Sequence, residues 1–379
     1  MLLDRRLLLA GGVSAALAIP ARAQDSVVEA AVEVTDHRVA LPAQMNGRGP
    51  FRLVIDTGAE LSGIRQAVAD TLGLRPQRQV RLNGRPFPLY AIDELVLGGA
   101  VRQSRAGFFG LGEAPGLGGD GLAAAGLITS LDSELLFEAQ RWRLHPSGLA
   151  DVSRYTAVAA RLEQPRAAGL SARPHGRVDV GGIELDTVWD TGAPHALSVP
   201  QDVAARLGLM QPDRPYALMP SRGIHGPASR PARLFAAPPI RVGEQVFEGV
   251  RAIVRMDDAT AGAAILGFPV LRCLDLAIAR GGAFIGVRRN ALRPVGMPYS
   301  LAGVWVDDYR GGVRVSEVGV GSPGAEAGLR PGDVITNLGA FSSALAALRG
   351  PAGTALPVTW TRGGQTLSAT LRLRDYLSA

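Results

Sequence analysis

Hydrophobic residues in this chain occur in short runs that are separated by glycine, proline and polar turns. The run Phe51–Ile55 ends at Asp56, which opens the sequence Asp-Thr-Gly-Ala, and the run Thr187–Trp189 ends at Asp190, which opens the same four residues. Short apolar runs bounded by turn residues are typical of buried β-strands. The pattern therefore predicts a mainly β protein in which two strands each deliver one carboxylate onto a Thr-Gly turn.

The residues that follow each aspartate also repeat. Asp56 and Asp190 are 190 − 56 = 134 positions apart, and the pattern Gln-x-Val-Ala-x-x-Leu-Gly-Leu occurs at both 66–74 and 201–209. Each copy predicts a short helix that ends at the glycine. A repeat of this length indicates a duplicated domain rather than a solenoid.

The duplication divides most of the chain into two similar lobes. We expect lobe 1 at residues 24–148 and lobe 2 at 149–292, with the two aspartates facing each other. Downstream of the aspartates, Gly126 in lobe 1 is matched to Gly267 in lobe 2. The sequence thus predicts that the lobes pair their carboxylates.

The C-terminal region, residues 298–379, follows a different pattern. A strand at 312–318 precedes a capped short helix and a Pro-Gly turn, and a helix at 342–348 precedes two final strands. Because this succession has no counterpart in the lobes, we expect a small separate domain.

The N-terminal residues 1–23 have the pattern of an export signal. Arg5 and Arg6 precede an apolar stretch that is too short for a comfortable membrane span, and Ala21-Arg22-Ala23 forms a small-x-small cleavage site. The arginine pair resembles a twin-arginine signal, and the alternative is an ordinary secretory signal that carries two arginines. Either route predicts a periplasmic or secreted protein without a stable membrane span after signal removal.

The amino-acid composition argues against several classes of function, including nucleic-acid binding and metal binding. The chain is 47% hydrophobic and 20% charged, which is typical of a globular protein. The net charge of +6 comes from scattered arginines rather than a basic run, so we expect no nucleic-acid partner. The single cysteine, Cys273, lies in an apolar run and is expected in the core. The dispersed histidines predict no metal site, and no cofactor is expected.

The two Asp-Thr-Gly-Ala turns, with Ile265-Leu266-Gly267 downstream, resemble the retropepsin-like aspartic proteases over roughly residues 30–290. The single chain with two lobes is similar to pepsin in plan. The resemblance implies a two-lobed aspartic-protease β-barrel fold in which Asp56 and Asp190 share one proton and activate water. It also implies supporting roles for Thr57, Gly58, Thr191 and Gly192. It further implies a substrate-covering flap at Gly223, His225 and Gly226, and the alternative is that this segment is an ordinary loop.

The C-terminal region resembles a bacterial PDZ domain through the run Gly-Ser-Pro followed by Ala-Gly-Leu-Arg-Pro-Gly-Asp-Val-Ile, residues 321–335. The resemblance implies that a peptide C-terminus binds at Leu301, Ala302, Gly303 and Val304, beside the helix at 342–348. The alternative is a domain that only docks within the protein.

Together these patterns favour an exported aspartic endopeptidase that acts on peptides or unfolded proteins. Glu60, Pro194 and His195 depart from the small polar residues usual after the two turns, so a catalytically inactive peptide-binding or scaffold protein is the alternative. His195 either tunes the dyad or lies on the rim of the site. A monomer is expected, because one chain carries both aspartates.

Overall fold

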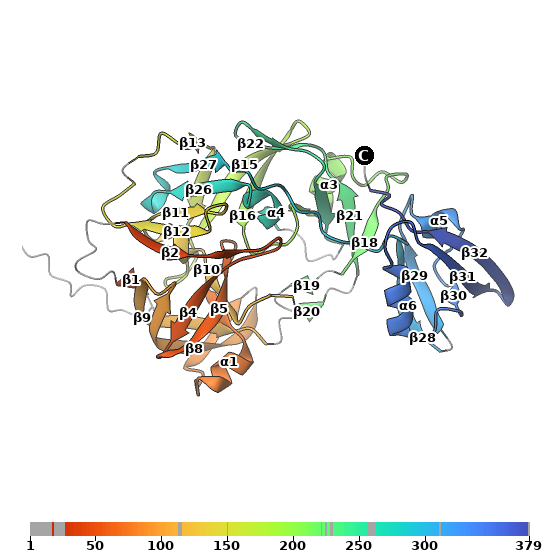
Figure 1. Cartoon of the computed structure of the whole chain (residues 1–379), viewed down its shortest axis with the longest axis horizontal. Helices are drawn as coiled ribbons and strands as arrows, with labels where there is room; N and C mark the ends of the chain where they lie inside the picture. Colours follow the sequence, from red (N-terminus) through yellow and green to blue (C-terminus); the bar gives the residue numbers. More distant parts are fainter. Residues whose placement is uncertain are drawn as a thin grey trace, which may run out of the picture.

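The structure is a computed structural model, and it describes residues 17–18, 27–82, 84–112, 116–149, 151–220, 222–223, 226–227, 230–256, 262–310 and 312–377. It is mainly β, as the sequence predicts. In Figure 1 two β-rich bodies lie beside each other, and a small C-terminal sheet lies at one end of the molecule. No helix in the described ranges is long and apolar enough to cross a membrane.

The first sheet contains nine strands and most of lobe 1. Strand β8 pairs with both β4 and β9, so β9, β6, β10, β5, β4 and β8 form a closed ring. Its strands are β1 (Leu17–Ala18), β3 (Glu33–Val34), β4 (Val39–Met45), β5 (Arg48–Asp56), β6 (Ser62–Ile64), β7 (Arg78–Leu82), β8 (Arg85–Leu97), β9 (Val101–Gly110) and β10 (Gly121–Ala124). Of the predicted export signal, only β1 falls within the described residues, and it pairs with β9.

The ten-stranded sheet of lobe 2 repeats this order. The succession β24-β17-β25-β16-β15-β22 corresponds to β9-β6-β10-β5-β4-β8, with the same parallel and antiparallel pairings. Its strands are β14 (Ala160–Glu163), β15 (Arg173–Val180), β16 (Ile183–Asp190), β17 (Leu197–Val199), β18 (Ala217–Met219), β21 (Ala232–Ala236), β22 (Ile240–Val242), β23 (Gln245–Phe247), β24 (Arg251–Val254) and β25 (Ala264–Gly267). The internal repeat seen in the sequence is therefore a repeat of topology.

The repeated Leu-Gly-Leu sequences terminate equivalent helices, α1 (Gln66–Thr71) and α3 (Gln201–Arg206). Gly73 has φ +65° and Gly208 has φ +69°, a left-handed conformation that glycine adopts without steric cost. The following leucine amides donate back to Ala69 and Ala204, at 2.9 Å in both lobes. This bond closes the last turn of each helix and explains why the glycine is retained in both copies.

A third sheet joins the two lobes. Its six strands run in the order β13-β27-β26-β11-β12-β2, so lobe 1 strands and lobe 2 strands meet where β11 pairs with β26. The strands are β2 (Val28–Ala31), β11 (Asp132–Leu136), β12 (Arg141–His145), β13 (Thr156–Ala157), β26 (Leu274–Ile278) and β27 (Ile285–Arg289). Short helical segments precede or interrupt these hairpins: α2 (Gly126–Thr129), α4 (Phe268–Leu271) and a 3₁₀ turn at Arg280–Gly282.

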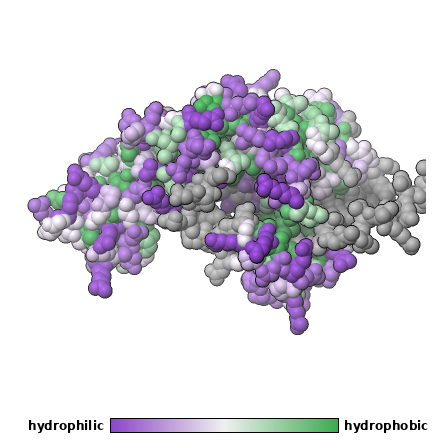
Figure 2. All heavy atoms as spheres, turned by 180° about the vertical axis from the view of Figure 1, so that it is seen from behind, coloured by the Kyte–Doolittle hydropathy of each residue, from purple (hydrophilic) through white to green (hydrophobic). Residues whose placement is uncertain are grey.

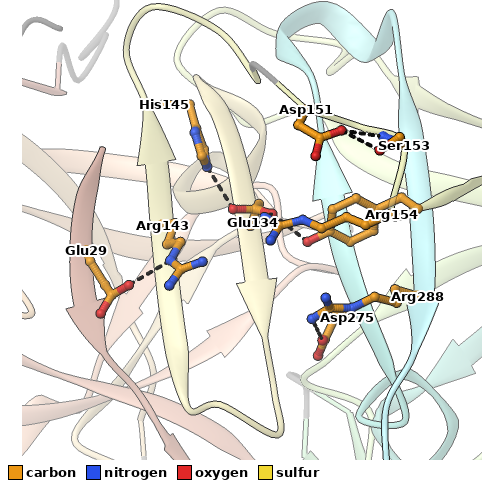
Figure 3. A network of polar contacts seen from close by, with 10 residues as sticks. Glu29, Glu134, Arg143, His145, Asp151, Ser153, Arg154, Asp275 and Arg288 are labelled. Atoms are coloured by element: carbon orange, nitrogen blue, oxygen red, sulfur yellow. Dashed lines mark hydrogen bonds and ion pairs between the residues drawn. The ribbon is translucent and has the colours of Figure 1, made fainter. Parts of the chain in front are cut away.

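Polar side chains hold this joining sheet together. Figure 3 shows Glu134 of β11 pointing toward His145 of β12 and toward Arg154. The Glu134 side chain is fully buried and accepts hydrogen bonds from the Tyr155 hydroxyl at 2.5 Å and from His145 Nε2 at 2.9 Å. A buried carboxylate with several donors tolerates loss of water because its charge is compensated.

The C-terminal region forms its own five-stranded sheet, with the edge strand β28 (Val304–Tyr309) first. The other elements are β29 (Gly312–Val318), β30 (Val334–Ile335), β31 (Ala355–Arg362), β32 (Gln365–Arg372), α5 (Pro323–Glu326) and α6 (Phe341–Leu348). It has a separate apolar core around Trp360. Contacts with lobe 2 include the Tyr216 hydroxyl, which donates to Glu317 at 3.1 Å, and Arg233, which pairs with Glu317 at 2.8 Å.

The outer surface is predominantly polar. Figure 2 shows hydrophilic residues over much of the face seen from behind, with apolar residues in smaller areas between them. Among the described residues, the large exposed apolar side chains are Val27, Val152, Val246 and Tyr309, which are far apart in the sequence. Single exposed apolar residues are normal on a globular protein and indicate no particular partner.

Candidate active site

The two aspartates end equivalent strands. Asp56 is the last residue of β5 and lies beside Ala124 of the parallel strand β10, and Asp190 ends β16 beside Gly267 of β25. The lobe 1 counterpart of Gly267 is therefore Ala124, and the sequence match with Gly126 is wrong by two positions because Gly126 already begins α2. Gly267 cannot be replaced by a larger residue without displacing the backbone, because a Cβ there would lie 1.9 Å from the His195 carbonyl oxygen.

Reciprocal threonine hydrogen bonds join the two turns. The Thr57 hydroxyl donates to the Trp189 carbonyl at 2.5 Å, and the Thr191 hydroxyl donates to the Ile55 carbonyl at 2.6 Å. Each hydroxyl also accepts from the opposite threonine amide, at 3.0 Å for Thr191 N–H and 3.2 Å for Thr57 N–H. Both threonines are fully buried, so four bonds lock the turn of one lobe onto the turn of the other.

The glycines of the turns bring the opposite carboxyl groups close. A Cβ at Gly58 would lie 2.4 Å from Cγ of Asp190, and a Cβ at Gly192 would lie 2.5 Å from Cγ of Asp56. These distances are shorter than any normal carbon contact, so each carboxyl group rests directly against the glycine of the other lobe. Only glycine permits this approach.

The carboxyl groups form a coupled pair with unequal surroundings. Asp190 accepts from the Gly192 and Ala193 amides at 2.7 and 3.1 Å, whereas Asp56 accepts from the Gly58 amide at 3.1 Å. Burial raises the pKa of Asp56, and the nearby charge of Asp190 and a hydrogen bond with it raise that pKa further. Burial also raises the pKa of Asp190, although the amide donors oppose this. The pair consequently retains a proton above the usual range of carboxyl groups.

His195 follows the lobe 2 turn, and its buried Nδ1 has no hydrogen-bond partner among the described atoms. Burial, followed by the positive charge of Arg38, lowers the pKa of His195 to about 4. The imidazole is therefore neutral over most of the pH range. Near pH 7 it therefore adds no positive charge after the lobe 2 turn.

The structure gives Glu60 a definite partner in the other lobe. Its carboxylate lies 3.7 Å from Nε of Arg173, whose Nη1 also approaches the Gly58 carbonyl at 3.4 Å. Arg173 pairs in addition with Glu163 at 2.5 Å, and His175 lies 2.9 Å from the same Glu163 oxygen. The departure at Glu60 is thus an ion pair that ties the lobe 1 turn to β15 of lobe 2.

Sequence reasoning missed Arg173 and its lobe 1 counterpart, Arg38. Both residues stand near the start of the hairpin strand that precedes an aspartate strand, 190 − 173 = 17 and 56 − 38 = 18 positions upstream. The two spacings differ by one residue, and an arginine at a similar distance before each aspartate was the available signal.

The other predicted site residues are not brought together with the dyad by any described contact. Gly223 of β19 (Arg222–Gly223) pairs with Gly226 of β20 (Gly226–Pro227) in an isolated hairpin, and His225 lies outside the described residues. Leu301 and Ala302 form a turn, Gly303 has φ +67°, and Val304 begins β28.

The loop at 301–304 is closely packed against the rest of the C-terminal region. The Gly303 amide donates to the Ser300 carbonyl at 3.0 Å, and the Gly324 amide donates to the Ala302 carbonyl at 2.9 Å. Within the part of the chain that is described, no group of three or more His, Cys, Asp or Glu side chains is arranged to hold a metal ion.

Comparison with known families agrees with this geometry. A family model described as aspartyl protease matches residues 41–113 and 176–270. The matched segments contain one Asp-Thr-Gly turn each, together with most of β4 and all of β5 in lobe 1 and most of β15 and all of β16 in lobe 2. A search of curated proteins finds no match to the chain. The family match supports a protease-like function and is consistent with the aspartic-protease fold.

Proposed function

We propose that this protein is an exported aspartic endopeptidase in which Asp56 and Asp190 form the catalytic dyad. The observation that carries the proposal is the mutual approach of the two carboxyl groups, enforced by the reciprocal bonds of Thr57 and Thr191. Two carboxyl groups in contact share one proton, because both cannot ionise at that separation.

The unequal hydrogen bonds favour a division of roles within the dyad. Asp190 has more amide donors, which stabilise its ionised form, and the pKa of Asp56 is raised well above its usual range. In this mechanism ionised Asp190 accepts a proton from a bound water, and the water oxygen attacks the scissile carbonyl carbon. Protonated Asp56 donates to the carbonyl oxygen, and the tetrahedral intermediate then collapses with a proton passing to the leaving amine. The proton inventory belongs to the pair, so kinetic pKa values describe both residues together.

The substrate of this reaction is a peptide or unfolded protein in the periplasm or outside the cell, and the enzyme acts as a monomer. The paired strands β19 and β20 cover the substrate in this proposal. The C-terminal region acts as a PDZ domain that binds a peptide end at residues 301–304. In support, β28 is an edge strand that follows the 301–304 loop directly, which is the arrangement a peptide needs to add as a further strand.

Cleavage of casein by the chain from Gln24 onward, from pH 3 to 7, tests the catalytic proposal. Asp56→Asn and Asp190→Asn each remove one member of the dyad while keeping the side-chain shape, so both variants are expected to lose cleavage by at least about 1,000-fold. Circular dichroism checks that the variants are folded. A folded wild-type protein that cleaves nothing across this range contradicts the proposal and favours a peptide-binding protein.

A further inference from the structure

The two aspartate hairpins each carry an arginine in an equivalent place. In lobe 1, Ala40 is paired with Val54, and in lobe 2, His175 is paired with Val188. Continuing each antiparallel register by two residues sets Arg38 opposite Asp56 and Arg173 opposite Asp190. The duplication therefore supplies two arginines beside the dyad, one from each lobe.

Arg173 is neutralised by acidic neighbours. Its Nη2 lies 2.5 Å from Glu163, and its Nε lies 3.7 Å from Glu60 in the turn of the opposite lobe. The charge of Arg173 is thus compensated by Glu163 and Glu60, and the contact with Glu60 positions the lobe 1 turn.

Arg38 has lost the corresponding acidic partner. The residue equivalent to Glu60 is at 60 + 134 = 194, which is Pro194. Among the described residues, the Arg38 guanidinium donates only to main-chain carbonyls: His37 at 2.7 Å, Gly116 at 3.1 Å and Leu117 at 3.4 Å. These contacts use Nε and one N–H on each Nη, which leaves one N–H on Nη1 and one on Nη2. With respect to the described residues, Arg38 therefore keeps a positive charge and two further N–H donors.

This charge acts directly on the catalytic centre. Burial lowers the pKa of the Arg38 guanidinium, and the charges of Asp56 and Asp190 act in the opposite direction. An arginine remains a cation under these conditions. His195, which follows the lobe 2 turn, has its pKa lowered to about 4 and is neutral near pH 7. Among the described residues, Arg38 is thus a cation of lobe 1 that lies opposite the dyad and pairs with no other carboxylate.

We propose that Arg38 forms a subsite for an acidic side chain of the peptide substrate, close to the scissile bond. The inference rests on the proposed function, because it assigns a substrate class to the same site. In this subsite a substrate carboxylate pairs with Arg38 in the way that Glu60 pairs with Arg173. The carboxylate accepts from the two remaining N–H groups of Arg38 as a bidentate pair. Without Arg38, the negative dyad repels such a carboxylate.

Position-scanned peptides test the subsite. The probe is a fluorogenic octapeptide with an Ala frame around Leu-Phe, in which a single Glu, or Gln as the uncharged match, is placed at each alanine position in turn. Wild-type protein is expected to cleave the Glu peptide about tenfold faster in kcat/KM than the Gln peptide at one position near the bond, which corresponds to about 1.4 kcal/mol. Arg38→Gln is expected to bring that ratio to about one, and Arg38→Lys to an intermediate ratio, because lysine keeps the charge but not the fork.

Arg173→Gln is the matched control, since it removes an arginine from the equivalent place in the other lobe. It is expected to lower kcat/KM for both peptides and to leave the Glu/Gln ratio unchanged. A ratio near one in the wild type at every position overturns the subsite. A pH profile that shifts in Arg38→Gln while the Glu preference persists also overturns it and assigns Arg38 to the dyad instead.

A binding measurement separates this inference from the proposed reaction. Calorimetric titration of the same Glu and Gln peptides into Asp190→Asn protein, with and without Arg38→Gln, reports recognition without cleavage. Tighter binding of a Glu peptide that depends on Arg38 supports the subsite even if the wild type proves inactive. If the wild type cleaves casein but folded Asp190→Asn protein binds each Glu peptide no more tightly than its Gln match, the subsite is overturned while the protease proposal stands.

Discussion

Replacement of Thr57 by valine tests whether the crossed threonine bonds hold the dyad together. Valine keeps the shape of the side chain but removes the hydroxyl group, which leaves the Trp189 carbonyl and the Thr191 amide without this partner. Thr57 is fully buried, so water cannot replace either bond. Each unsatisfied buried group costs about 1–3 kcal/mol, and the variant should therefore lose about 2–6 kcal/mol of unfolding free energy.

Thr57→Ser is the matched control. It retains the hydroxyl group and loses one methyl group, which predicts a cost of about 1 kcal/mol. Urea unfolding followed by tryptophan fluorescence measures both variants, because Trp189 is fully buried next to Asp190. The activity of the valine variant should also fall by about 100-fold in kcat/KM, since small displacements of reacting groups are costly.

Equal urea midpoints and equal kcat/KM values for the valine and serine variants would refute this reasoning. That result would mean that the hydroxyl bonds contribute neither to stability nor to the approach of Asp56 and Asp190. A loss of stability without a loss of activity would mean that the threonine bonds stabilise the fold but do not position Asp56 and Asp190.

Two further predictions concern pH. Burial and the charge of Asp190 raise the pKa of Asp56 in the native protein. The protonated Asp56 carboxyl group therefore stabilises the folded wild type below the ordinary carboxyl pKa of about 4. This stabilisation is lost as the pH rises through the native pKa of Asp56. The thermal midpoint of Asp56→Asn should therefore improve relative to wild type between pH 4 and pH 7, and a constant difference would contradict the raised pKa. Burial alone would raise the pKa of Glu134, but hydrogen bonds from Tyr155, His145 and Arg154 hold that pKa below its usual range. The contribution of ionised Glu134 to the free energy of unfolding is therefore present above about pH 4. It is lost as the pH falls through the native pKa of Glu134. Glu134→Gln should cost about 3–5 kcal/mol in urea unfolding at pH 7, and a cost that stays the same at pH 3 would contradict this assignment.

The sequence was most informative where the chain repeats. The mainly β class and the helices ended by Gly73 and Gly208 follow from local preferences that the tertiary structure reinforces. The equivalent placement of Asp56 and Asp190 also follows from the repeat, because duplicated segments adopt the same topology. The export signal and the peptide-binding role of the C-terminal region stay predictions.

Long-range polar contacts were not accessible in the same way. The pairing of Arg173 with Glu60 joins residues 173 − 60 = 113 positions apart, and nothing local in either segment specifies the partner. The placement of Arg38 and Arg173 opposite the aspartates depends on the registers of β4 and β15, which the sequence does not specify. The mistaken match of Gly126 with Gly267 has a similar cause, since a glycine near an apolar pair does not reveal which residue lies beside the aspartate.

The joining sheet has a consequence for how the chain acquires its site during synthesis. Strand β11 of lobe 1 finds its neighbour β26 only after residue 278 has been made, so until then β11 presents an unpaired edge. Pairings between segments so far apart in the sequence form slowly, because the intervening chain must be closed into a loop first. The nascent first half therefore lacks this pairing, and Asp56 and Asp190 meet only when most of the polypeptide is present.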